Sequence, residues 1–159
     1  MITVQMVYSW LEDVKDPEIP VLSLVDLGII REIDIQQDSV KVTITPTFVG
    51  CPALEMMKSE ITAKLLENGV REVSVAVSYS RPWTSDHISE KGKIALKNFG
   101  LAPPPPITLI DDLDILPDAS CPRCGGTNTA MRTPFGPTLC RSIHYCHDCH
   151  EAFEQFKPL

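Results

Sequence analysis

The stretch VKVTITPTFVGCP, residues 40–52, decides the fold of the larger part of the chain. Branched apolar residues alternate with Lys and Thr over residues 40–45, which predicts a half-buried β-strand. A loop over residues 46–50 follows, and the next pattern predicts a helix over Pro52–Asn68, because proline suits the first helical position. The same stretch therefore places Cys51 at the N-cap of a helix, directly after a strand–loop unit.

The segments on either side of this stretch predict further elements. Apolar residues at helical spacing indicate helices over 4–14 and 86–98, and residues that alternate indicate strands over 29–35 and 73–77. The predicted order is α-β-β-α-β-α. This order is typical of an α+β fold, a small mixed sheet with helices packed on it.

Four consecutive prolines, 103–106, mark the clearest domain boundary, because a polyproline segment acts as a semi-rigid spacer. We expect an α+β domain over 1–102, a Pro-rich linker and connecting segment over 103–118, and a four-cysteine module over 119–159. A single chain of 159 residues has room for one domain and one such small module.

The four-cysteine module carries two Cys-x2-Cys pairs, Cys121 with Cys124 and Cys146 with Cys149. Two residues between cysteines allow a tight turn to aim both sulfurs at one ion, and two such turns complete a tetrahedral Zn²⁺ site. The spacing predicts a structural zinc ribbon, in which four thiolates leave no open position for catalysis. An iron–sulfur site and a rubredoxin-like iron site stay open, because four cysteines suit them as well.

Four other side chains in the module are candidate ligands. Cys140 is either a replacement ligand or a buried small hydrophobic residue, which is the more usual role of a thiol outside a site. His144, His147 and His150 lie beside the cysteine pairs. We expect these histidines to be exposed or to contact the ligands rather than to bind metal.

Cys51 stands far from the other five cysteines in the sequence. At a helix N-cap the backbone N–H groups and the helix dipole would stabilise its thiolate. The alternative is a buried inert thiol. His87 is the only histidine in the predicted domain and no resolving cysteine stands at position 48 or 54, so nucleophilic catalysis and thiol exchange are disfavoured. A thiolate that transiently holds a metal or cluster, shared across a homodimer in one arrangement, fits better than an enzyme.

Charge and hydropathy exclude several classes of partner. The chain has a formal charge of -7, with 10 Lys/Arg and 18 Asp/Glu in residues 1–118, so a nucleic-acid ligand is not expected. The sequence contains no apolar run long enough to span a membrane and no signal-peptide pattern at its start. We therefore expect a cytoplasmic protein, in which cysteine pairs bind metal more often than they form disulfides.

Several motifs of the first hundred residues resemble the metal–sulfur cluster assembly family. The similarity rests on Asp16-Pro17-Glu18-Ile19-Pro20, Asp26-Leu27-Gly28, Thr43-x-Thr45-Pro46-Thr47-x-x-Gly50-Cys51-Pro52 and Pro82-Trp83-Thr84-x-Asp86-x-Ile88-Ser89. This resemblance implies a small α+β domain that acts in iron–sulfur protein maturation. It also implies a role in cluster or iron transfer for Cys51, with Asp16, Glu18 and Thr47 in neighbouring motif positions.

With its cysteine tail the chain resembles the PaaD family almost end to end. The tail contributes Cys121-Pro122-Arg123-Cys124-Gly125, Phe135-Gly136-Pro137-Thr138-x-Cys140 and Phe153-x-x-Phe156-Lys157. PaaD proteins are accessory subunits of the phenylacetyl-CoA epoxidase, so the resemblance implies maturation of that oxygenase, especially of its iron–sulfur reductase. The tail cysteines would then be metal ligands. A structural or regulatory subunit of the oxygenase complex, without metal transfer, is the alternative.

Overall fold

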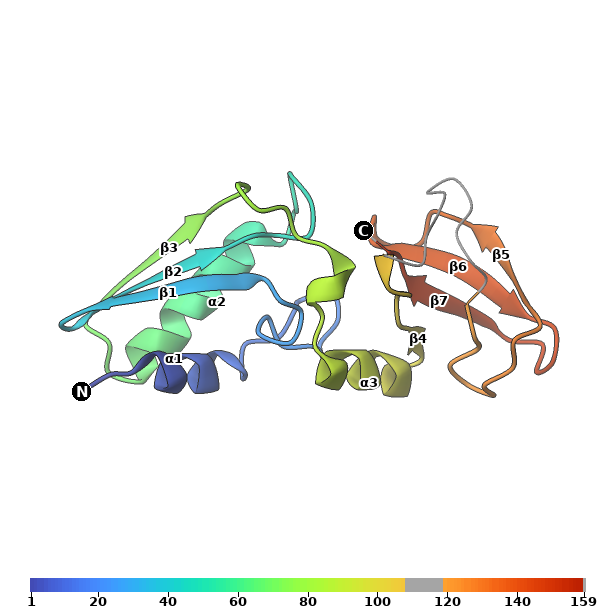
Figure 1. Cartoon of the computed structure of the whole chain (residues 1–159), viewed down its shortest axis with the longest axis horizontal. Coiled ribbons are helices and arrows are strands. Elements are labelled where there is room, and N and C mark those ends of the chain that lie inside the picture. The colour runs from blue at the N-terminus through green and yellow to red at the C-terminus, as the bar shows by residue number, and fades with distance from the viewer. Residues whose placement is uncertain (108–118, 159) are drawn as a thin grey trace. The chain divides into compact units, whose positions relative to one another are not determined.

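The computed structural model describes residues 1–107 and 119–158. The predicted linker therefore lies partly outside the described residues, from 108 to 118. The chain divides into two compact units (Figure 1), Met1–Trp83 with His87–Ser89, and Thr84–Asp86 with Glu90–Leu159. Each unit is described by itself below.

The first unit is built on a three-stranded mixed sheet. Its elements are α1 (Val4–Leu11), β1 (Ile30–Gln36), β2 (Ser39–Ile44), α2 (Leu54–Glu67) and β3 (Glu72–Val77). The strands lie in the order β1-β2-β3, with β1 antiparallel and β3 parallel to β2. The α2 helix makes the crossover that a parallel pair requires (Figure 1). The predicted α+β fold with a small mixed sheet is confirmed.

Burial of one sheet face explains why this stretch of sequence forms β2. Val40, Val42 and Ile44 are fully buried, whereas Lys41 between them is exposed. The opposing surface of α2 comes from residues three or four positions apart, Met57, Ile61 and Leu65, which are also fully buried. The apolar face of β2 and the apolar face of α2 therefore pack together in one layer. The α1 helix completes this layer by packing against α2 and β1.

All three predicted helices have different bounds in the structure, and α2 begins two residues after the predicted Pro52. The first ends at Leu11, before Val14, because the chain there turns into a loop whose Val14 carbonyl accepts a hydrogen bond from Leu24 N–H at 2.9 Å. The predicted helix over 86–98 is in fact a 3₁₀ turn, η1 (Ser85–His87), and then α3 (Glu90–Phe99). The break falls at Ser89, which donates its N–H to the Asp26 carbonyl at 2.8 Å and its hydroxyl to the Asp26 carboxylate at 2.7 Å. These non-local bonds replace helical ones.

A second tertiary contact anchors the same segment in the first unit. Trp83 is buried, and its indole N–H donates to the Leu27 carbonyl at 2.8 Å. Gly28 adopts φ +76°, and a Cβ at this position would collide with the His87 carbonyl oxygen. Only glycine satisfies both conditions, the left-handed backbone and the close approach. The Asp-Leu-Gly and Pro-Trp-Thr motifs therefore lie against each other.

The second unit contains α3 and a four-stranded sheet. Its strands are β4 (Leu101–Ala102), β5 (Thr129–Thr133), β6 (Arg141–Cys146) and β7 (Ala152–Phe156). They lie in the order β4-β7-β6-β5, with β4 parallel to β7 and the other pairs antiparallel. The two residues of β4 show no periodic pattern, so the sequence did not predict this strand. Since α3 and β4 belong to this unit, it begins before the predicted boundary at residue 102; the domain limits stay a prediction.

The lengths of the helices can be compared with the prediction that the chain contains no membrane-spanning segment. In the part of the chain that the structure describes, no helix is both long enough and apolar enough to cross a bilayer.

Candidate functional site

The first cysteine pair lies on a tight backbone turn in the second unit. Gly125 N–H donates to the Cys121 carbonyl at 2.9 Å, and Cys121 N–H donates to the Gly126 carbonyl at the same distance. Gly125 has φ +75°, the left-handed conformation that this turn requires. Gly126 N–H points at the Cys124 sulfur at 3.3 Å. The backbone thereby stabilises negative charge on a sulfur atom before any ion binds.

The second pair repeats this geometry without glycine. Cys146 lies at the end of β6, and its N–H donates to the Glu151 carbonyl at 2.9 Å. His150, directly after Cys149, takes the left-handed conformation with φ +60°. A non-glycine residue with positive φ is uncommon and indicates a turn held by its surroundings. The two turns are thus equivalent, and each presents two sulfurs toward the other.

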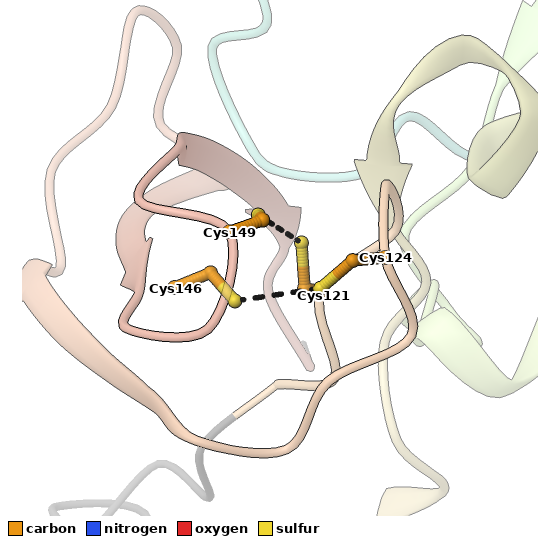
Figure 2. Close-up of side chains that lie close together, drawn as sticks. All are labelled: Cys121, Cys124, Cys146 and Cys149. Carbon is orange, nitrogen blue, oxygen red and sulfur yellow. Dashed lines mark hydrogen bonds between the residues drawn. The ribbon is translucent and has the colours of Figure 1, made fainter.

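The four sulfur atoms form a compact cluster (Figure 2). Cys121 Sγ lies 3.7 Å from Cys149 Sγ, Cys124 Sγ lies 3.6 Å from Cys146 Sγ, and all four lie within 4.8 Å of one another. A tetrahedral ion with Zn–S bonds of 2.3 Å requires sulfurs about 3.8 Å apart. The two separations of 3.7 and 3.6 Å therefore match the edges of a ZnS₄ tetrahedron, and both are far too long for disulfide bonds.

The acid–base properties of these thiols favour a bound cation. Burial acts to raise the pKa of Cys121, but backbone N–H groups of Cys124 and Arg123 outweigh it and lower this pKa to about 7. Burial raises the pKa of Cys149 to about 12, and its neighbouring thiols add to this shift. One thiol ionises readily and then opposes ionisation of the next. A divalent cation removes this repulsion, so the cluster is suited to bind metal, with zinc the best fit.

The other candidate ligands of the module lie outside the cluster. Cys140 is buried, with its sulfur 3.1 Å from the Thr138 hydroxyl. His144 is buried, its ring forms a hydrogen bond with the Ser142 hydroxyl at 2.9 Å, and it stacks on Phe153. His147 and His150 are exposed. The exposed pair agrees with expectation, whereas the burial of His144 was not predicted, because it depends on the pairing of β6 with β7.

Cys51 lies in the first unit, in the loop between β2 and α2. The prediction that it is the N-cap residue is wrong: α2 begins at Leu54 and its N-cap is Ala53. The intervening residues form a turn in which the Cys51 carbonyl accepts a hydrogen bond from Leu54 N–H at 3.2 Å. Cys51 is half-buried, after the exposed residues Val49 and Gly50. The helix-dipole argument for a thiolate is therefore weaker than the sequence indicated.

The residues predicted to act with Cys51 lie in two different loops. The Asp16 carboxylate accepts hydrogen bonds from Glu18 N–H and Ile19 N–H, both at 2.8 Å, and so shapes the loop after α1. Glu18 is exposed, and Thr47 is half-buried in the same loop as Cys51. Within residues 1–107 and 119–158, the only group of three or more Cys, His, Asp or Glu side chains able to hold a metal is the four-cysteine cluster. The structure thus gathers the tail ligands but forms no such group around Cys51.

Comparison with protein families gives a class to each part of the chain. Residues 4–77 match the model of an iron–sulfur cluster assembly protein, and residues 112–157 match a PaaD zinc β-ribbon domain. The chain is thus an iron–sulfur assembly domain followed by a zinc ribbon. Over 154 residues it is 32% identical to an Escherichia coli strain K12 protein that is provisionally named as a subunit of 1,2-phenylacetyl-CoA epoxidase, covering 97% of this chain and 92% of the relative. The chain belongs to the PaaD family.

Other relatives resemble only part of the chain. The Fe-S protein maturation auxiliary factor YitW of Bacillus subtilis is 35% identical over 88 residues, which are 54% of this chain and 85% of the relative. A crystal structure of a DUF59 domain from Bacillus anthracis superposes with a TM-score of 0.55 at 32% identity, covering 58% of this chain and 89% of that one. A conserved hypothetical protein of Thermotoga maritima gives a TM-score of 0.52 at 30% identity, covering 63% of this chain and 96% of that one.

Proposed function

We propose that this protein is a non-enzymatic maturation factor that delivers iron or an iron–sulfur cluster through Cys51 to the phenylacetyl-CoA epoxidase, chiefly to its iron–sulfur reductase. The match of residues 4–77 to an iron–sulfur assembly protein carries the proposal. Relatives named Fe-S maturation auxiliary factors, YitW and SufT of Staphylococcus aureus, align over little more than half of this chain but 85% and 96% of their own. These alignments span 88 and 85 residues, more than the tail of residues 119–159 contains, so they must include the first unit. They therefore support transfer of iron or a cluster by the first unit.

Cys51 has the chemistry of a transient ligand. An iron–sulfur cluster is normally held by four thiolates, and Cys51 belongs to no group of three or more ligating side chains among the described residues. A single thiolate bond is weak enough to exchange, and the remaining ligands would come from the client or from a second copy of the chain. In each exchange the bond from iron to Cys51 breaks as one to a client cysteine forms. The client thiol passes its proton to Cys51, and no electron is transferred.

The neighbouring motif residues have supporting roles in this proposal. Asp16 fixes the loop that presents Glu18, through its two backbone hydrogen bonds. The exposed Glu18 carboxylate and the Thr47 hydroxyl are oxygen ligands suited to an incoming iron ion. They would act on iron delivered as an ion rather than as a finished cluster.

The zinc ribbon would dock the client. Between β5 and β6 its loop exposes two large apolar side chains, Phe135 at 72% and Leu139 at 64% of their full surface. Apolar residues exposed together favour protein contact. The module also lacks the acidic excess of the rest of the chain, with 4 Lys/Arg and 3 Asp/Glu in residues 119–159.

The test replaces Cys51 by Ala in a strain whose only copy of this gene carries the change. We expect growth on phenylacetate to fail, and the purified reductase component to lack iron and acid-labile sulfide, while the variant keeps its zinc. Cys140→Ala is the matched control, since it removes a buried thiol outside the four-cysteine cluster. Full growth of the Cys51→Ala strain on phenylacetate would contradict the proposal.

A structural or regulatory role within the oxygenase complex is the second candidate function. It is supported by the E. coli relative, whose name makes it a subunit of an epoxidase. It requires stable, stoichiometric co-purification with the oxygenase components, whether or not Cys51 is present. Transient maturation requires that the mature oxygenase be active after this protein is removed.

A further inference from the structure

A polar groove lies in the first unit, and no cysteine is part of its lining. It has a volume of about 640 Å³ and is formed where β1 begins, where β2 ends and where the chain leaves β3. Its lining includes two arginines, one histidine and several hydroxyl groups: Arg31, Arg81, His87, Thr43, Ser78 and Ser80. Pockets of 300–1,000 Å³ are typical of small-molecule sites. The groove is therefore large enough for a small ligand, and its lining is mainly polar.

The two arginines supply positive charge, and neither forms an ion pair in the part of the chain that the structure describes. Arg31 Nη2 makes a long hydrogen bond of 3.5 Å to the Arg81 carbonyl, which brings its guanidinium to the backbone of the second arginine. Within the described residues, neither guanidinium lies within ion-pair distance of a carboxylate. By contrast, Arg71 at the other end of β3 pairs with Asp38 at 3.3 Å. Two arginines without an ion pair, in a unit that is otherwise acidic, indicate an anion-binding site.

The hydroxyl groups of the groove are held in place by their own bonds. Ser78 Oγ lies 2.9 Å from Ser80 Oγ, so the two side chains face the same way. The buried Thr45 hydroxyl donates to the Ser78 carbonyl at 2.7 Å, which fixes the backbone where the chain leaves β3. Preorganised donors lower the entropic cost of binding a ligand. The groove therefore offers fixed hydroxyls beside two guanidinium groups.

We propose that this groove binds a small molecule through a phosphate group, with Arg31 and Arg81 as its charged contacts and Ser78 and Ser80 as hydroxyl donors. Guanidinium groups donate two parallel N–H bonds to an oxyanion, and a phosphate has enough oxygens to receive hydroxyl donors in addition. Glu32, which is exposed, is the one carboxylate in the lining. It opposes an anion and sets a limit on affinity. This site is independent of the metal chemistry proposed above.

The test uses the zinc-loaded full chain and pyrophosphate as the probe, with isothermal titration calorimetry for affinity and amide NMR shifts for location. We expect shifts at Ser78 and Ser80, and a loss in affinity of about tenfold or more for Arg31→Met and for Arg81→Met, as expected for a charge-assisted bond. Glu32→Gln should tighten binding. Arg71→Met is the matched control and should leave affinity unchanged, because this residue lies outside the groove.

Each outcome decides the proposal. The proposal is overturned if no binding is detected with about 10 mM pyrophosphate, because a dissociation constant weaker than this is too weak for a specific site. Equal or tighter binding of citrate would overturn the assignment to phosphate, because citrate is an anion that contains no phosphate group. An equal loss in Arg71→Met would show that the effect is general surface charge. Thermal unfolding of each variant must match the wild type, and Arg31→Lys provides a second variant that keeps the charge but removes the bidentate geometry.

Discussion

In the second unit four sulfur atoms lie within 4.8 Å of one another, whereas in the first unit Cys51 lies half-buried in a loop and belongs to no such group among the described residues. A thiol beside a turn thus occurs once within a set of four possible ligands and once without such a set among the described residues. A complete ligand set holds its ion permanently, and an incomplete one can only share it. The comparison thus separates a four-thiol cluster suited to a permanently bound ion from a single thiol for which we propose transfer.

The two units also obtain their stability differently. In the second unit Cys121, Cys146 and Phe153 belong to one buried cluster, so two of the four clustered cysteines are themselves part of the hydrophobic core. The first unit has an apolar layer between sheet and helices, with fully buried residues such as Val42 and Ile61. Loss of metal should therefore affect one unit and spare the other.

The largest expected effect follows from removing one ligand. Cys146→Ser should abolish zinc binding and unfold the second unit, because structural zinc contributes about 10 kcal/mol or more in small modules. The first unit should keep its own unfolding transition. Metal analysis and calorimetry check this, with Cys140→Ala as control because Cys140 is equally buried but outside the sulfur cluster. A full zinc content in Cys146→Ser would contradict the assignment of this ligand.

The next effect concerns backbone packing in the first unit. Gly28→Ala should destabilise this unit by about 3 kcal/mol, from left-handed strain together with the collision with His87. Gly69→Ala is the matched control, since Gly69 has φ +90° but no atom within 4 Å of an added Cβ. It should lose only the strain, about 1 kcal/mol. Equal losses in urea unfolding would show that the contact with His87 does not matter.

A smaller effect is the coupling of zinc binding to pH. With its pKa raised to about 12, Cys149 releases a proton on binding zinc throughout the neutral range. Cys121, with its pKa lowered to about 7, releases one only below that pH. Zinc affinity should therefore fall as the pH falls, and about one more proton should be released per ion below pH 7 than above it. Calorimetry in buffers of different ionisation enthalpy measures this count. A count that is constant from pH 6 to 8.5 would contradict the expectation.

The smallest effect concerns an exposed ion pair in the first unit. Lys64 on α2 contacts Asp13 at 2.8 Å, and its hydrogen bond lowers the pKa of Asp13 below 3.8. A carboxylate with a lowered pKa contributes stability that is present above its unfolded pKa and is lost as the pH falls through the folded one. Asp13→Asn should thus lower the melting temperature of the first unit slightly at pH 7, less than Gly69→Ala does, and this decrease should disappear as the pH falls through the lowered pKa of Asp13.

Glu60→Gln, which removes an exposed carboxylate of α2 from outside this ion pair, is the control for the change in net charge. An equal decrease in both variants at pH 7 would assign the effect to overall charge rather than to the contact with Lys64.

The strands and α2 could be predicted because their burial repeats along the sequence. Val40, Val42 and Ile44 alternate in the sequence as they alternate in the sheet. The helix ends were predicted less well, because Ser89 and Asp26 are 63 residues apart and their hydrogen bond breaks the predicted helix. The Cys51 prediction failed for a related reason: the turn after Gly50 delays the start of α2 to Leu54, and a proline signal alone cannot show this.

By itself the sequence predicted the α+β class and the four-cysteine cluster, since both depend on spacing within short segments, either strand period or two residues between cysteines. The tertiary structure decided which residues meet. It paired β4 with β7, moved Cys51 away from the helix N-cap, and brought Arg31 of β1 to Arg81 after β3. Such contacts join segments far apart in the chain, and their free energy comes from packing and backbone geometry that no local pattern records.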